Sequence, residues 1–318
     1  MATFSTDRMG ILEAWRRAGY TNAEELLGEL LQQNDFLRVA AVAPANKGFF
    51  NETLRAKELG KGKVTDINGG IPSLASKTDK VSDPVIMFEG QSFVDERLFL
   101  GAPDPAAVRQ SEDAMNLAGF SLSWNDLLVY GKPQDANGFS GLAARRSKIA
   151  GGHVLDMAGT TNLSSAYLIE FGTQGMRLLH AQHGTPGISS VDKGEQKVDA
   201  QDGTGKYWAF EMDYRITFGL SVRQDAALWR IANIDITSST LDSLLPNVIK
   251  AKNKLPSKGQ RCFLFANSDV KSLIDILVLN SASNVRTVEI ENYGPVTMFL
   301  SVPVMTMDAI TSAETKVS

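Results

Sequence analysis

The side chains best suited to binding a metal ion are two closely spaced histidines, His180 and His183. On a helix, residues three apart face the same side, so both rings could reach one zinc ion. Gly184 and Gly187 follow the pair and disfavour a helix, and no third ligand stands at a recognisable spacing. His153 follows two glycines and is expected in a loop. We therefore expect no metal site.

The candidate nucleophile is Cys262, the only cysteine of the chain, which also excludes an internal disulfide. It lies in the apolar run 261–265 (Arg-Cys-Phe-Leu-Phe), so we expect a buried thiol. The run 203–206 (Gly-Thr-Gly-Lys) lacks the upstream glycine and the following Ser or Thr of a phosphate-binding loop, and is expected to be a hairpin turn. The neighbouring carboxylates Glu112 and Asp113 would point apart on a helix.

Recognisable catalytic motifs are missing from the sequence. It has no dinucleotide-binding fingerprint, no nucleophile elbow and no zincin helix motif. Ionisable residues are present, but they form no pattern that could hold a cofactor or carry out acid–base chemistry. We therefore expect a protein that is not an enzyme, with no catalytic residues, no cofactor and no metal.

The composition predicts a folded protein with one large domain or two smaller ones. Of the 318 residues, 43% are apolar and 21% are charged, which excludes general disorder. The net charge of -4 argues against a dedicated nucleic-acid-binding protein, which would carry a basic excess. No apolar stretch reaches about 18 residues, and residues 1–20 lack the apolar core of a signal peptide. We expect a soluble chain made in a reducing cytoplasm, without a membrane partner.

Residues 51–84 differ from the rest of the chain in composition. Glycines and lysines interleave there, and no aromatic residue stands between Phe50 and Phe88. Such a segment cannot form a core of its own, because it has few apolar residues and its glycines are costly to order. The flanking segments 49–56 and 85–99 have strand character. We expect a long hairpin with a polar tip that projects from the body, and a loop of this length usually has a function.

A long helix is predicted to begin after Asp104. This residue can cap the helix, and Pro105 suits the first helical position, where its missing amide costs nothing. The pattern continues to about Tyr130, where Gly131 and Pro133 end it. At about 1.5 Å per residue, the helix is a rod of roughly 39 Å.

The strongest periodic signal lies in residues 207–222. Apolar side chains occupy eight successive alternate positions there. This period of two predicts a strand with one buried face and one wet face, and sixteen residues would span about 53 Å. Together with the long helix and the hairpin, such a strand predicts an extended, plate-like subunit.

The remaining elements are shorter. A capping box at its start predicts a helix over 21–33. Later segments predict a helix over 240–254, a strand over 261–265, a helix capped by Ser268 and a strand over 296–310. Helices and strands thus both contribute, and the later part of the chain has α/β character.

Several segments together resemble a known family. The run 229–235 (Trp-Arg-Ile-Ala-Asn-Ile-Asp), with Arg223 upstream, resembles a segment of the major capsid proteins of tailed phages. Other matching segments, in chain order, are 111–113 (Ser-Glu-Asp), 130–131 (Tyr-Gly), 138–142 (Gly-Phe-Ser-Gly-Leu), 171–180, 267–270 (Asn-Ser-Asp-Val), 302–304 (Val-Pro-Val) and 308–310 (Asp-Ala-Ile). Over about residues 105–310 the chain resembles the Epsilon-fifteen type of podovirus, whose shell has the Hong Kong 97 capsid fold. It departs from the family at 223–226, where Arg-Gln-Asp-Ala stands in place of Arg-Asp-Trp-Arg.

The resemblance implies an α+β fold of the Hong Kong 97 type. Its expected parts are an N-terminal arm (1–47), an extended-loop hairpin (48–101), a peripheral domain with a long spine helix (102–235), an axial domain (236–294) and a return to the peripheral domain (295–318).

The implied function is that of a major capsid protein. Such a protein self-assembles as hexamers and pentamers into the icosahedral head shell around phage double-stranded DNA, which it encloses without sequence-specific binding. The expected partners are further copies of the chain, a separate scaffolding protein, a portal protein and, where the shell is decorated, a cement protein. The expected location is the virion head, assembled in the host bacterial cytoplasm as a procapsid that then matures.

Charged residues of the extended loop are the candidate inter-subunit contacts. They are Lys57, Glu58, Lys61, Lys63, Lys77 and Lys80. Two alternatives stay open at this point. One is the shell of an encapsulin-like protein compartment, and the other, less favoured, is a soluble α/β ligand-binding domain or enzyme with an ordered region 51–84.

Overall fold

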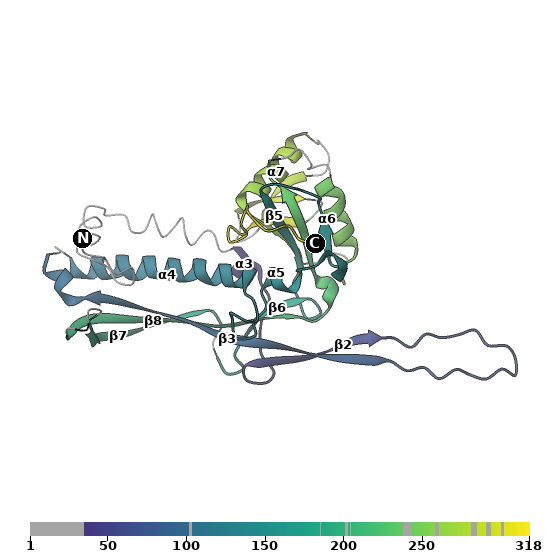
Figure 1. Ribbon diagram of the computed structural model, residues 1–318, viewed down its shortest axis with the longest axis horizontal. Coiled ribbons are helices and arrows are strands. Elements are labelled where there is room, and N and C mark those ends of the chain that lie inside the picture. The colour runs from purple at the N-terminus through teal and green to yellow at the C-terminus, as the bar shows by residue number, and fades with distance from the viewer. Residues whose placement is uncertain are drawn as a thin grey trace.

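The chain folds into an elongated molecule with a central body and two extensions (Figure 1). The computed structural model describes residues 35–101, 104–184, 186–200, 203, 205–237, 243–257, 261–280, 285–290, 294–299 and 302–318. The helix predicted over 21–33 lies outside these residues. A hairpin extends from one side of the body, while one helix and several strands extend from the other.

Two sheets and a long helix make up the fold. The first sheet has the order β1 (Val42–Pro44), β6 (Met176–His180), β8 (Lys206–Val222), β3 (Lys77–Asp95) and β2 (Phe50–Glu58), with β7 (Ile188–Asp199) also paired to β8. The second has the order β11 (Val285–Ile290), β12 (Gly294–Phe299), β13 (Val302–Thr306), β10 (Cys262–Ala266), β5 (Leu163–Glu170), β9 (Leu228–Asp235) and β4 (Val154–Asp156). The helices are α3 (Asp35–Val39), α4 (Pro105–Tyr130), α5 (Leu142–Arg145), α6 (Leu244–Asn253) and α7 (Ser268–Asn280), with short 3-10 helices η1 (Glu96–Gly101), η2 (Ile149–Gly151) and η3 (Asp225–Ala227).

The predicted long helix is confirmed as α4. The carboxylate of Asp104 accepts hydrogen bonds from the backbone N–H groups of Ala106 (3.0 Å) and Ala107 (3.2 Å), and Pro105 takes the first helical position. Trp124 and Leu128 are fully buried between α4 and the first sheet. The helix therefore braces the sheet along one face.

The predicted long strand is confirmed as β8. It pairs antiparallel with β3 from Val85↔Gly219 to Asp95↔Ala209, and β7 pairs along its opposite edge. The alternating apolar side chains are buried toward the body, but Trp208 is 49% exposed. This difference arises because the outer end of the strand lies beyond the main core, whose β8 members begin at Met212.

The predicted hairpin is confirmed, with different strand limits. Strand β2 pairs antiparallel with the first part of β3, from Phe50↔Pro84 to Glu58↔Lys77, and a turn closed by a 2.9 Å hydrogen bond from Gly69 N to Asp66 O lies at the tip. The strand thus begins at residue 77 and not at 85, while 96–101 form a 3-10 helix. Polar residues extend the strand because they pair across it, a stabilisation that a search for apolar alternation does not detect.

The second sheet carries the remaining corrections. Helix α6 begins at Leu244, with Pro246 in its first turn, where proline is tolerated. Helix α7 is capped by Asn267 and not by Ser268, because the Asn267 side chain accepts a 2.9 Å hydrogen bond from Val270 N. The strand predicted over 296–310 is two antiparallel strands, β12 and β13.

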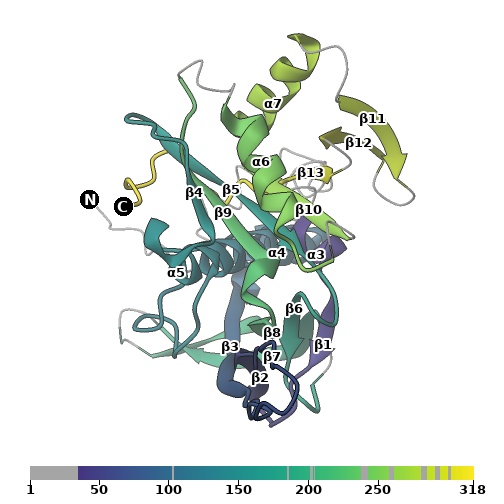
Figure 2. The ribbon, with the colours of Figure 1, turned by 90° about the vertical axis from the view of Figure 1, so that its right-hand side faces the viewer.

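Helices α6 and α7 lie beside the second sheet, which stands above the first sheet in this view (Figure 2). No helix within the described ranges has the length and apolar composition needed to cross a membrane.

Candidate assembly surface

Among the described residues, the tip of the β2–β3 hairpin, residues 59–76, is the most exposed segment. Val64, Ile67 and Ile71 are 93%, 94% and 92% exposed, and Leu59 and Leu74 are also largely exposed. Isolated apolar side chains on a surface are ordinary, but several on one projection indicate a surface that is covered by another protein. The tip is therefore a candidate interface.

The charged residues predicted in this hairpin fall into two groups. Four of the six, Lys57, Glu58, Lys77 and Lys80, form ion pairs across the two strands. The pairs are Lys57–Asp79 (3.2 Å), Lys77–Glu58 (2.9 Å) and Lys80–Glu52 (2.7 Å). Lys61 and Lys63 lie in the tip and have no ion pair among the described residues. Exposed ion pairs contribute little stability, so these four side chains can exchange partners when another surface approaches.

The root of the hairpin is fixed to the body by a buried ion pair. Arg145 of α5 donates to the carboxylate of Asp83 on β3 (3.0 Å) and to the carbonyl of Leu220 on β8 (2.7 Å). Nearby, the Asn51 amide donates to the Ser221 hydroxyl (3.1 Å) inside the protein. The hairpin thus projects from a firm base.

A second anchor joins the root to the turn between β8 and β9. Arg55 of β2 donates to the carboxylate of Asp225 (2.9 Å) and to the carbonyl of Val222. Arg146 donates to the backbone carbonyl of Asp225 (2.6 Å), and its side chain lies 3.6 Å from the carboxylate. Burial lowers the pKa of Arg146, partly offset by Asp225. Sequence reasoning missed this role of Asp225, which lies where the chain departs from the family pattern.

A buried polar cluster holds the C-terminal segment, α4 and the second sheet together. Arg230 of β9 forms a 2.9 Å ion pair with Glu314, and their side chains are only 6% and 4% exposed. Arg230 also donates to the Ser165 hydroxyl (2.9 Å), and the Tyr130 hydroxyl at the end of α4 donates to Glu314 (2.8 Å). Burial, and then the Glu314 charge, raise the pKa of Tyr130, so its hydroxyl stays protonated. Arg230 belongs to the run that carries the family resemblance.

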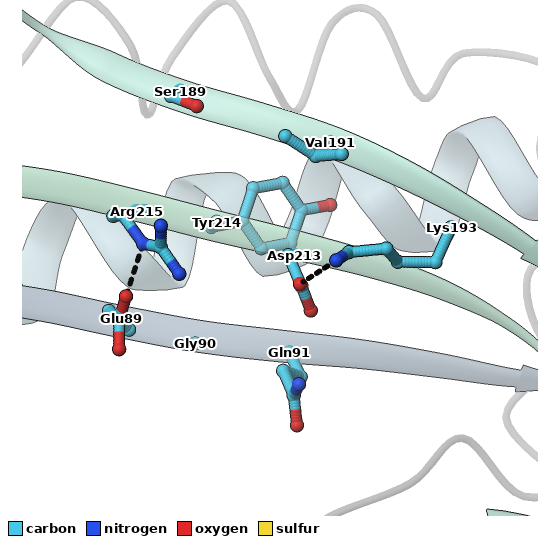
Figure 3. A pocket seen from close by; sticks show the side chains of 9 residues that line it. All are labelled: Glu89, Gly90, Gln91, Ser189, Val191, Lys193, Asp213, Tyr214 and Arg215. Carbon is cyan, nitrogen blue, oxygen red and sulfur yellow. Dashed lines mark hydrogen bonds and ion pairs between the residues drawn. The ribbon is translucent and has the colours of Figure 1, made fainter.

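The uncovered face of the first sheet contains a shallow hollow of 440 Å³ (Figure 3). Its charges are matched across the strands: Arg215 pairs with Glu89, and Lys193 with Asp213 at 3.3 Å. The charged side chains that line this hollow are thus paired with one another and indicate no ligand.

The candidate chemical residues lie apart from one another. His180 is on β6 with its Nδ1 2.8 Å from the Ala181 carbonyl, and no group of three or more His, Cys, Asp or Glu in the described ranges is placed to hold a metal. Cys262 is buried on β10, as predicted, and burial raises its pKa to about 11. Asp199 at the end of β7 pairs with Lys206 at the start of β8, and Ala200 N donates a 2.8 Å hydrogen bond to Gly205 O, which agrees with the predicted hairpin turn.

Comparison with known proteins identifies the group to which these features belong. The family model described as Major capsid protein GP7 matches residues 21–318. A chain in the near-atomic resolution structure of bacteriophage Epsilon15 has a TM-score of 0.73 and 22% identity, covering 100% of this chain and 99% of that one. This likeness confirms the predicted capsid fold.

Weaker structural likenesses accompany it. A chain of the bacteriophage JBD30 capsid has a TM-score of 0.48 and 14% identity, covering 87% of this chain and 91% of that one. A chain of the holo-SrpI encapsulin complex from Synechococcus elongatus has a TM-score of 0.44 and 11% identity, covering 64% of this chain and 88% of that one. No curated protein sequence matches the chain.

Proposed function

The chain belongs to the family of major capsid protein GP7, and from this premise we propose how it builds a phage head. As a phage major capsid protein, it associates with copies of itself in the shell of the virion. In our proposal these copies form hexamers and pentamers that close an icosahedral head around double-stranded DNA. An encapsulin-like compartment and a soluble enzyme are not favoured, because the matching family consists of major capsid proteins.

The structure can be divided into parts that serve this assembly. We keep the division into arm (1–47), extended loop (48–101), peripheral domain (102–235), axial domain (236–294) and return (295–318). Support comes from the projecting hairpin within 48–101 and from α4 and the long β8 within 102–235. The return of 295–318 is supported by Glu314, whose carboxylate accepts a 2.8 Å hydrogen bond from Tyr130 of α4.

The exposed hairpin tip is the observation that carries the proposal. A tip with Val64, Ile67 and Ile71 almost wholly exposed has no core of its own, while its root is fixed by a buried ion pair. A second copy of the chain would cover these side chains and gain about 25 cal/mol per Å² of apolar surface. Lys61 and Lys63 would then meet carboxylates of that copy. Each contact is weak, but the many contacts of a closed shell act together.

The other partners follow from this role. We propose a separate scaffolding protein, a portal protein and, on a decorated shell, a cement protein, with assembly in the host bacterial cytoplasm and later maturation. The net charge of -4 suits a wall that confines DNA without binding its phosphates tightly. Such a role requires no catalysis.

The test places charges at the hairpin tip. The variant with Ile67→Asp and Ile71→Asp should keep the thermal unfolding of the parent subunit but lower the yield of closed shells at least about tenfold. Shells are measured by sedimentation velocity and negative-stain microscopy after co-expression with the neighbouring phage genes. The matched control, Thr65→Asp with Ser73→Asp, adds the same charge to the tip without removing apolar side chains, and should assemble. Normal shells from the isoleucine variant would overturn the assignment.

A further inference from the structure

A hollow of 560 Å³ lies at the root of the hairpin, between β2 and the turn that connects β8 to β9. Its polar lining consists of Arg55, His153, Gln174, Arg223, Gln224 and Asp225. Burial, and then Arg146, lower the pKa of His153, so this ring is neutral at pH 7. The charge of the hollow is therefore set by its arginines and one aspartate.

This hollow has more positive charge than its own residues neutralise. Asp225 is shared between Arg55 and Arg146. The Nε of Arg55 is buried without a hydrogen-bond partner among the described residues. The Arg223 side chain is exposed and has no ion pair within the described part of the chain. Two guanidinium groups of the lining, those of Arg55 and Arg223, thus share the hollow with one carboxylate, and that carboxylate also pairs with Arg146. The charges of the hollow in Figure 3 are, by contrast, paired with one another.

The end of the molecule that points away from the hairpin has the complementary charge (Figure 1). We define the acidic end as the described residues among 88–117 and 188–213, which comprise the outer parts of β3 and β8, η1, the first half of α4 and β7 (Figure 1). It contains eleven Asp and Glu residues against five Lys and Arg residues. Glu89 is paired with Arg215, just outside these ranges, and with this pair set aside the excess is five negative charges, which is larger than the net charge of the whole chain, -4. The charge of the subunit is thus separated along its length.

The two charged regions of one subunit cannot touch each other. On the acidic end, Glu195 is exposed and pairs with Phe210 in the β7–β8 ladder. Phe210 therefore marks the position of Glu195 along β8. Arg223 comes thirteen residues after Phe210 along an extended strand, so it lies about 43 Å from this position. An ion pair requires contact within about 4 Å, so any pairing between these regions joins two molecules.

We propose that the hairpin-root hollow accepts carboxylates from the acidic end of a second copy of the chain. Complementary patches on different parts of the molecule form a head-to-tail contact, the kind that closes into a ring. Glu96 and Glu195 are the candidate donors, because both are exposed and neither has an ion pair among the described residues. Opposite charges also speed the encounter of the copies and fix their orientation. This inference rests on the proposed function, since it names the partner and the residues of the same assembly.

A charge-reversal experiment tests the contact. Arg223→Glu should lower the yield of closed shells at least about tenfold, while its unfolding curve stays that of the parent because the side chain is exposed. Adding Glu195→Arg or Glu96→Arg to Arg223→Glu should restore at least half of the parent yield. Lys148→Glu is the matched control, because Lys148 is an exposed cation outside the hollow; this variant should assemble like the parent.

The outcomes separate this inference from the proposed function. If the parent chain with its neighbouring gene products forms no shells, the proposed function itself fails. If the parent forms shells and Arg223→Glu does so equally well, or if neither reversal restores assembly, the head-to-tail contact is wrong. Normal Arg223→Glu shells that fail to retain DNA would assign the hollow to phosphate groups and overturn the inference as well.

Discussion

At the scale of single residues, the most constrained side chains in the described part of the chain are buried charged groups with a structural role. Arg230 binds Glu314, Ser165 and the carbonyl of Arg146 (3.0 Å) from within the protein. Such a cluster is favourable only while every member is satisfied, because an unpaired charge in the interior has lost its water. Its value is that it fixes the position of three separate segments.

The first prediction concerns this cluster. Arg230→Ala should lower the free energy of unfolding by about 3–5 kcal/mol, because Glu314 would be left buried without its counter-charge. The measurement is urea unfolding followed by circular dichroism. Arg230→Met combined with Glu314→Leu removes both charges and should lose less than Arg230→Ala alone. A single variant as stable as the parent would show that the ion pair has no structural role.

The second prediction concerns the buried thiol of Cys262, whose pKa is about 11. At pH 8 only about one thiol in a thousand is then ionised, so a thiol reagent should modify the native protein far more slowly than the urea-unfolded protein. Above about pH 8.5 the unfolded thiol ionises while the native thiol keeps its proton, so stability should fall as the pH rises toward 11. Cys262→Ala is the control for both readings. Rapid modification of the native protein would contradict burial.

At the scale of elements, Gly141, the N-cap residue of α5, packs closely against the end of the long helix α4. A β-carbon at Gly141 would lie 2.8 Å from three backbone atoms: Gly131 N, Leu128 O and Val129 O. Backbone atoms cannot rotate away as a side chain can, so the end of α4 would have to shift.

The third prediction follows from that crowding. Gly141→Ala should lower the free energy of unfolding by about 1–3 kcal/mol, as overpacking usually does. Gly119→Ala is the matched control in the same region: a β-carbon there meets nothing within 4 Å, and Gly119 lies inside α4. That change should raise stability by up to about 1 kcal/mol, because alanine favours helices. Thermal unfolding measures both, and effects of the same sign would contradict the geometry.

The elements that the sequence predicted well are those with local signals. Helix α4 has its cap and its terminating glycine within the segment, and β8 shows its alternation directly. The contacts that fix the candidate surface depend on partners far along the chain. Asp83 meets Arg145 from 62 positions away, and Asp225 meets Arg55 from 170 positions away. No sequence-spacing rule connects such residues, so the role of Asp225 could be recognised only from the three-dimensional structure.

At the scale of the whole molecule, shape and charge act together. The hairpin extends from one side of the body and the acidic end from the other (Figure 1). In our proposal neighbouring copies therefore meet through unlike surfaces. An interface of this kind does not pair two identical patches, and it can continue from copy to copy until a ring closes. In this proposal the lysines of the tip, the hairpin-root hollow and the acidic end all serve the same assembly.

The Arg230–Glu314 ion pair also has a consequence for protein synthesis. Glu314 lies 84 positions after Arg230, so the ribosome makes the hairpin, α4 and most of the second sheet before this carboxylate exists. Until then the nascent chain carries Arg230 without its counter-charge, and the sheet stays less stable than in the finished subunit. The fold is thus completed only after the hairpin tip, the proposed contact surface, has been made.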